Sequence, residues 1–242
     1  MQNTTEAQTA TQLYLQDVHR AFDGYKAING LSLVIAKGEL RAVVGPNGAG
    51  KTTMLDIITG KTRPDVGQVV WGQDTDLTRL DEASCARLGI GRKFQKPTVF
   101  ETLSVSDNLM LALANDRGVP ATLFHRGSQT EAQRIAGLLE TVGLGAERER
   151  LAGLLSHGQK QWLEIGMLLV QNADVLLLDE PVAGMSTEER EETGNLLRRI
   201  GAERTVVVVE HDMDFMRAFA TSVTVLASIF RVAGGWCVFW VW

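Results

Sequence analysis

Four short apolar segments, each followed by a polar residue or a glycine, constrain the fold of this chain most. They are ELRAVV before Gly45, LGIGRKF before Gln95, DVLLLD before Glu180 and RTVVVVE before His211. Continuous apolar runs of this length are typical of strands buried on both faces of a parallel sheet. Helical periodicity separates them, over residues 51–60, 105–115, 130–142, 159–171 and 187–200. The alternation predicts an open α/β sheet, with ligands bound beyond the carboxyl ends of its strands.

Two regions depart from this alternation. Near the N-terminus, LYLQDVHRAF and INGLSLVIAKGE alternate apolar and polar residues, as half-exposed antiparallel strands do, and GQVVWGQ is a candidate third strand. From about residue 96 to 158 the sequence has helical and loop patterns but no convincing strand. We therefore expect one α/β domain, over residues 13–226, with an antiparallel β subdomain and an inserted, mostly helical subdomain. A chain of 242 residues is long enough for it.

Composition and the two ends of the chain exclude several classes. A net charge of −5 offers no basic surface for nucleic acid. Cys85 and Cys237 are too far apart in sequence to suggest a disulfide framework or a zinc site, which favours a reducing compartment. Residues 1–12 lack the pattern of a signal peptide and are expected to be a disordered tail. Residues 227–242 form an atypical apolar tail, which a truncated or frame-shifted end would explain. Arg231 and Gly234-Gly235 argue against a membrane-spanning helix there.

The stretch GPNGAGKTT, residues 45–53, has the spacing of a phosphate-binding P-loop between a strand and a helix. Its glycines let successive backbone N–H groups face phosphate oxygens. Lys51 is expected to reach the β- and γ-phosphates, and the Thr52 hydroxyl is expected to bind Mg²⁺. The other residues expected to contact the nucleotide here are Asn47, Gly48, Gly50 and Thr53.

Acidic and amide side chains at other strand ends fit the same chemistry. In VLLLDE, Asp179 is the expected Mg²⁺ ligand, directly or through water, and Glu180 is the candidate general base or water-positioning group. His211 is a candidate contact of the γ-phosphate. Gln95 is a candidate ligand of Mg²⁺ or a candidate contact of the attacking water. Alone, each of these residues could be an ordinary solvated strand end.

The stretch LLSHGQKQ, residues 154–161, raises a different question. Ser156 and His157 are adjacent, but a nucleophile and its base are recognised by geometry and not by adjacency. Ser156 and Gln159 instead form a capping box at the start of the helix that follows. Because Gly158 lies in the first turn, free N–H groups and the positive end of the helix dipole make this end a candidate anion site.

Taken together, these motifs resemble those of the ATP-binding subunit of an ABC transporter, over residues 13–226. They follow in the family's order: Walker A, Gln95, a signature sequence LSHGQ, Walker B and His211. The resemblance implies an ABC ATPase of the P-loop NTPase class that binds ATP and Mg²⁺. It also implies that two subunits, identical or related, pair head to tail. Ser156, Gly158 and Gln159 would then contact the γ-phosphate of ATP held by the other subunit. The adenine-stacking aromatic residue would be Phe22, with Tyr25 as the alternative.

Two positions depart from the family pattern. His157 stands where the signature usually has a glycine, and Ser186 stands where the next loop usually has an aspartate. With Glu189, Ser186 can cap the helix that follows.

Three long stretches narrow the resemblance to importers of branched-chain amino acids and related solutes. The stretches begin at residues 89, 155 and 206, and bacterial urea importers are the most similar group. This resemblance implies integral membrane permease subunits, an indirect link to a solute-binding protein, and a peripheral position on the cytoplasmic side of the bacterial inner membrane. A soluble ABC ATPase without a transport role and a non-catalytic nucleotide-binding module are the alternatives.

Overall fold

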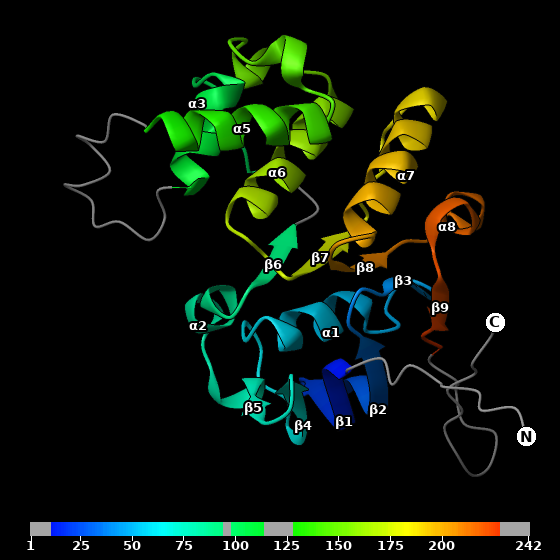
Figure 1. The fold of residues 1–242 in the computed structure, drawn as a ribbon. Coiled ribbons are helices and arrows are strands. Elements are labelled where there is room, and N and C mark those ends of the chain that lie inside the picture. Colours follow the sequence, from blue (N-terminus) through cyan, green and yellow to red (C-terminus); the bar gives the residue numbers. More distant parts are fainter. Residues whose placement is uncertain (1–10, 94–97, 114–127, 228–242) are drawn as a thin grey trace, which may run out of the picture.

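The strands form two sheets of different kinds (Figure 1). The computed structural model describes residues 11–93, 98–113 and 128–227. A parallel sheet has the strand order β6-β7-β8-β3-β9, and an antiparallel sheet has the order β2-β1-β4-β5. The parallel strands are β3 (Leu40–Val44), β6 (Ile90–Lys93), β7 (Val175–Asp179), β8 (Thr205–Val209) and β9 (Ser222–Val225). The antiparallel strands are β1 (Thr11–Phe22), β2 (Tyr25–Ala36), β4 (Val66–Trp71) and β5 (Thr75–Asp76).

The expected α/β sheet, the antiparallel subdomain and its candidate third strand, β4, are confirmed. The short strand β5 carries no recognisable pattern and was not predicted. β1 begins at Thr11, ahead of the expected domain start at residue 13.

Five helices lie where the sequence predicts them. They are α1 (Lys51–Ile58), α3 (Val105–Leu113), α5 (Gln129–Thr141), α6 (His157–Val170) and α7 (Thr187–Gly201). The helices α2 (Glu82–Arg87) and α8 (Met213–Phe219) were missed, because so few turns give no clear apolar period. In the described part of the chain, 3₁₀ turns cover Leu77–Arg79, Gly145–Glu147 and Ala152–Leu154. The described part of the 96–158 region contains α3, α5, two 3₁₀ turns and the loops between them, and its one strand-like contact is an isolated bridge between Ser104 and Leu151. The boundaries of the expected helical insertion stay a prediction.

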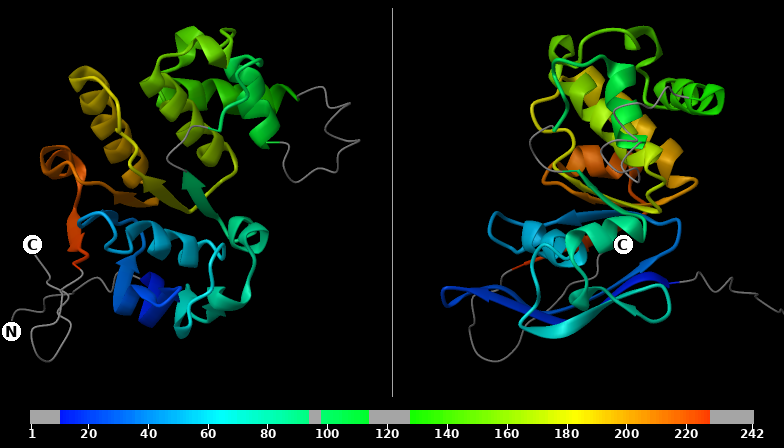
Figure 2. Two further views of the ribbon diagram at one scale, coloured as in Figure 1. Left: turned by 180° about the vertical axis from the view of Figure 1, so that it is seen from behind. Right: turned by 90° about the vertical axis from the view of Figure 1, so that its left-hand side faces the viewer.

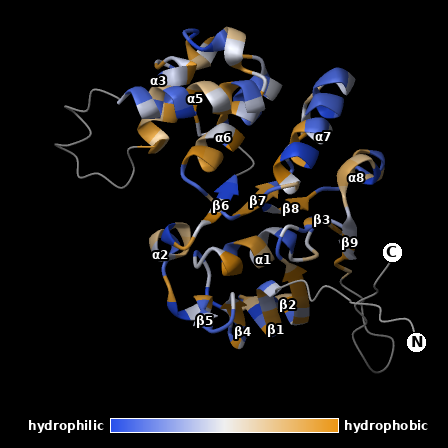
Figure 3. Cartoon of the chain, in the orientation of Figure 1, coloured by the Kyte–Doolittle hydropathy of each residue, from blue (hydrophilic) through white to orange (hydrophobic). Residues whose placement is uncertain are grey.

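Both faces of the parallel sheet are covered, as the apolar runs predict (Figure 2). Because side chains alternate along a strand, Ala42 and Val44 of β3 join a hydrophobic core with α6, α7 and the helical subdomain. Val43 joins a second core with α1 and the antiparallel sheet. Figure 3 shows the hydrophobic colours of β7 and β8 between these layers, whereas α7 is mostly hydrophilic. The strands are therefore fixed from both sides, and their carboxyl ends make a common edge.

The strand β6 buries the side chains of two charged residues that are adjacent in sequence. The side chains of Arg92 and Lys93 are 4% and 0% exposed. Arg92 pairs with Asp56 of α1, and Lys93 lies 3.8 Å from Glu164 of α6. Burial lowers the pKa of Lys93 and raises that of Glu164, while the attraction between the two charges opposes both shifts. These pairs attach the edge strand to helices on both faces of the sheet.

The last described strand ends next to the P-loop. β9 pairs with β3, and the Leu226 amide donates to the Val44 carbonyl oxygen at 2.7 Å. Leu226 is buried, so the core extends to the expected domain end at residue 226. The apolar tail from residue 228 onward lies outside the described residues. Among those described, no helix combines the length and the apolar character that a membrane span requires.

Candidate nucleotide-binding site

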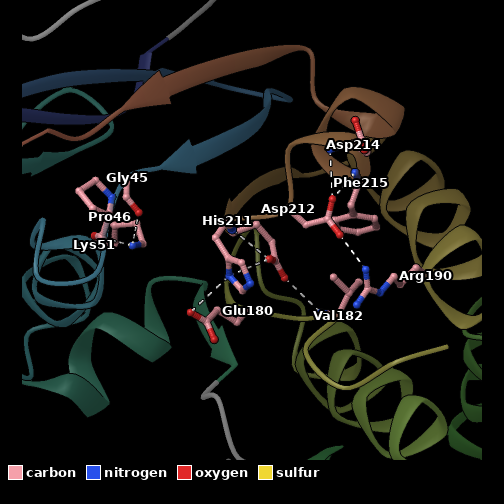
Figure 4. A network of polar contacts seen from close by, with 11 residues as sticks. Gly45, Pro46, Lys51, Glu180, Val182, Arg190, His211, Asp212, Asp214 and Phe215 are labelled. Carbon is pink, nitrogen blue, oxygen red and sulfur yellow. Dashed lines mark hydrogen bonds and ion pairs between the residues drawn. The ribbon is translucent and has the colours of Figure 1, made fainter. Parts of the chain in front are cut away.

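The loop between β3 and α1 has the backbone that a P-loop needs. Gly48 and Gly50 have φ angles of 83° and 89°, in the left-handed region that favours glycine. A Cβ atom at Gly50 would also collide with the Ala27 carbonyl oxygen. Lys51 is the first residue of α1, and its Nζ donates to the carbonyl oxygens of Gly45 at 2.6 Å and Pro46 at 3.0 Å (Figure 4). The lysine ammonium is therefore held over the mouth of the loop.

A pocket of ≈ 300 Å³ opens beside this loop. Its lining brings together most of the expected site residues of the P-loop side, which are Phe22, Tyr25, Asn47, Gly48, Gly50, Lys51, Thr52, Thr53 and Glu180, and adds Ala27, which was not predicted. Phe22 and Tyr25 are both exposed and face each other across the β1–β2 turn. The Arg20 guanidinium lies 4.6 Å from the centre of the Phe22 ring, and the Tyr25 hydroxyl donates to the Gly48 carbonyl oxygen at 3.0 Å. Either ring is placed to contact a base.

Asp179 and Thr52 meet although they are far apart in sequence. The Thr52 hydroxyl donates to Asp179 Oδ2 at 3.3 Å, while Asp179 Oδ1 is buried and has no hydrogen-bond partner. Burial raises the pKa of the Asp179 carboxyl, and the nearby Arg92 guanidinium partly offsets this effect. An unsatisfied buried carboxylate oxygen beside a hydroxyl fits Mg²⁺, which takes few protein ligands and keeps phosphate and water oxygens. Among the described residues, no group of three or more His, Cys, Asp or Glu side chains could hold a metal ion.

Glu180 lies at the same edge in an unusual conformation. Its φ angle is 47°, which is uncommon for a residue other than glycine and marks a backbone held by its surroundings. Its amide donates to the Val209 carbonyl oxygen at 2.9 Å, and its carboxylate lies 3.9 Å from His211 Nδ1 (Figure 4). Glu180 lines the pocket at the P-loop, and the His211 side chain beside it is 68% exposed.

The residues at the amino end of α6 make capping contacts and do not line this pocket. Ser156 caps α6 through the predicted box with Gln159, and Ser186 caps α7 through the predicted box with Glu189. Ser156, Gly158 and Gln159 are not among the residues that line the pocket at the P-loop. The exposed His157 places Nε2 3.2 Å from the Gln161 side chain and leaves the capping geometry intact.

Sequence reasoning missed two charged residues at the site. Arg92 lies 3.8 Å from Asp179, and the Glu210 carboxylate accepts hydrogen bonds from the amides of Val182 and His211. Arg92 and Lys93 are two charged residues in a strand that is otherwise apolar, and this departure from the pattern could have identified Arg92 from the sequence. Glu210 looks like an ordinary strand end until its burial is known. Gln95 lies outside the described residues.

Comparison with known proteins agrees with this geometry. The ABC transporter family profile matches residues 28–183. The chain belongs to the ABC transporter family. It is 32% identical to the high-affinity branched-chain amino acid transport ATP-binding protein LivG of Salmonella typhimurium over 223 residues, which cover 88% of this chain and 87% of that protein. A probable LivG of Methanocaldococcus jannaschii is 30% identical over 84% of this chain and 81% of its own length.

Solved structures of ABC cassettes match the whole fold. A nucleotide-free ATP-binding cassette has a TM-score of 0.78 and 28% identity, and the match covers 90% of this chain and 88% of that one. A cassette in a dimeric post-hydrolysis state bound to ADP and phosphate has a TM-score of 0.75 and 26% identity, with 88% and 94% covered. The protein is therefore an ABC ATPase subunit of the importer type, which couples ATP hydrolysis to transport.

Proposed function

We propose that this ABC ATPase subunit binds Mg·ATP in the pocket at the P-loop and hydrolyses it to drive import of a branched-chain amino acid or a related small solute. The observation that carries the catalytic part is the meeting of Lys51, Thr52, Asp179 and Glu180 at one edge of the sheet. The solute is suggested by the relatives, whose names specify branched-chain amino acids. Urea, the narrower expectation, has no support from the relatives named here and stays a prediction.

The residues around the pocket have separate roles in binding phosphate, adenine and Mg²⁺. Backbone N–H groups of the loop from Asn47 to Gly50 and the Lys51 ammonium bind phosphate oxygens. Phe22 or Tyr25 stacks on adenine. Thr52 and Asp179 would hold Mg²⁺, which would supply positive charge to offset that of the phosphates. Thr53 completes the phosphate contacts at the start of α1.

Hydrolysis assigns a second set of roles. Glu180 orients or deprotonates the attacking water, because its carboxylate faces the pocket beside the P-loop. His211, which follows β8, contacts the γ-phosphate. Gln95, which lies outside the described residues, is assigned to Mg²⁺ or the attacking water. Ser156, Gly158 and Gln159 bind the γ-phosphate of ATP held by a second cassette, identical or related. This trans arrangement is supported by the absence of the three residues from the pocket lining and by the dimeric cassettes among the solved relatives.

Binding and hydrolysis can be separated with single substitutions. Lys51→Ala removes the ammonium at the phosphates and should weaken Mg·ATP binding, measured with a fluorescent nucleotide. Glu180→Gln keeps the pocket and should retain binding while losing most steady-state phosphate release. Lys37→Ala, which changes an exposed lysine in the turn after β2, is the control and should alter neither measurement. Wild-type turnover in Glu180→Gln would contradict the assignment of that residue.

The solute and the membrane partners need the assembled importer. We expect this subunit to copurify with integral membrane permease subunits and to lie on the cytoplasmic face of the membrane. ATP hydrolysis by the reconstituted complex should rise with a leucine-loaded solute-binding protein and should not rise with urea. A rise with urea alone would instead support the narrower expectation from the sequence.

A further inference from the structure

The amino end of α6 is already in contact with a carboxylate of this chain. The Ser156 hydroxyl donates to Glu189 Oε1 at 2.7 Å. A Cβ atom built on Gly158 would lie 2.6 Å from the carboxyl carbon of Glu189, so the carboxylate also fills the space that this glycine leaves open. Glu189 belongs to the first turn of α7 and approaches α6 from a different element. One carboxylate thus touches two of the three residues assigned to the γ-phosphate.

Capping of α7 alone does not require this contact. In the box that caps α7, Glu189 Oε2 accepts from the Ser186 amide at 3.0 Å, and the Glu189 amide donates to the Ser186 hydroxyl. The box at α5 has the same reciprocal pair, formed by Ser128 and Glu131. Since the cap uses Oε2, the other oxygen of Glu189 remains for Ser156. The Ser156 contact is therefore a second interaction of the same side chain.

We propose that Glu189 is an internal competitor of the γ-phosphate, and that nucleotide-driven pairing of two cassettes must exchange this carboxylate for the phosphate of the facing subunit. This inference rests on the trans arrangement proposed above. The amino end of a helix attracts one anion through its free N–H groups and its dipole. A second anion at the same place meets the charge of the first, so both cannot use the Ser156 hydroxyl and the surface of Gly158.

The exchange has a defined effect on affinity. When the Glu189 carboxylate gives up the Ser156 hydroxyl, a charge-assisted hydrogen bond is lost. While Glu189 stays close to the phosphate, the two negative charges repel each other. Both effects oppose pairing and neither acts on Mg·ATP binding within one subunit. Glu189 would thus set how much of the binding free energy of ATP remains for association of the cassettes.

The test compares Glu189→Gln with Glu188→Gln, both in a Glu180→Gln background so that ATP persists. Glutamine keeps an oxygen for the Ser186 amide and removes the charge. Glu188 is the matched control because it carries the same charge in the same turn and is exposed. The full chain, with a related partner cassette where that is the natural pair, is titrated with Mg·ATP and association is followed by sedimentation. Fluorescent-nucleotide binding to the unpaired subunit verifies that each variant is folded.

We expect Glu189→Gln to tighten ATP-dependent association by about tenfold for each composite site, as a change of one charge-assisted hydrogen bond would produce. Glu188→Gln should match the parent. Unchanged or weaker association of Glu189→Gln, with association of the parent intact, overturns this inference and leaves the proposed function standing. If ATP drives no association in any variant although each binds nucleotide, the trans arrangement itself fails.

Discussion

Ser156→Arg places a long cation at the amino end of α6, and its consequences can be worked out from the contacts there. The substitution removes the hydroxyl that accepts from the Gln159 amide at 3.1 Å, and loss of such a cap costs about 0.5–2 kcal/mol. Typical domains have a free energy of unfolding of about 5–15 kcal/mol, so the variant should remain folded. The new guanidinium faces Glu189 and occupies the space that the γ-phosphate of the facing subunit needs. Hydrolysis should be lost while Mg·ATP binding to the P-loop pocket persists.

The assay mixes this variant with Glu180→Gln, each of which forms only dead sites by itself. In a mixed dimer, one composite site carries both changes and the other carries neither. An equal mixture that pairs at random contains mixed dimers in half of its population, so about one quarter of the wild-type site activity should return. Steady-state phosphate release measures this recovery. Where the natural partner is a related subunit, the two changes are first placed in different subunits, which puts both on one composite site and should retain hydrolysis at the other. They are then placed in the same subunit, which puts one change on each site and should abolish hydrolysis.

A lack of recovery in paired protein would falsify the head-to-tail reasoning, because sites complete within one chain gain nothing from mixing. The control is Ser128→Arg, which removes the cap of α5 through the same kind of capping box. It should lose a similar amount of stability and retain hydrolysis. If Ser128→Arg also abolished hydrolysis, the effect of Ser156→Arg would have to be assigned to stability.

Three further outcomes are expected. Phe22→Ala should weaken nucleotide binding by about 1–3 kcal/mol if this ring stacks on adenine, and a loss confined to Tyr25→Ala would assign the stacking to the alternative residue. Thr193→Val leaves the buried Trp162 Nε1–H, which donates to Thr193 Oγ1 at 2.8 Å, without its acceptor and should lower the free energy of unfolding by about 1–3 kcal/mol in urea titration. Deleting residues 228–242 should keep nucleotide binding and improve or preserve solubility, whereas lost binding would show that the tail belongs to the core.

Local patterns in the sequence determined most elements and the chemistry they carry. The apolar runs of β3, β7 and β8, the loop from Gly45 to Thr53 and the capping boxes at Ser156 and Ser186 each depend on neighbours within a turn or a strand. Such features can be predicted from the sequence because backbone geometry repeats over two to four residues. The short elements β5, α2 and α8 were missed for the same reason, since they are too brief to show a period.

Only the tertiary structure decided which of these features meet. It placed β3 between β8 and β9, which brings Thr52 to Asp179 across a separation of 127 residues, and it buried Arg92 and Lys93 against charges on two helices. It also joined Ser156 to Glu189. In the sequence, each of these two helix ends has its own capping box, with no sign of a contact between them. Sheet order and contacts between elements depend on the packing of both faces of the sheet at once, and no local period encodes that packing.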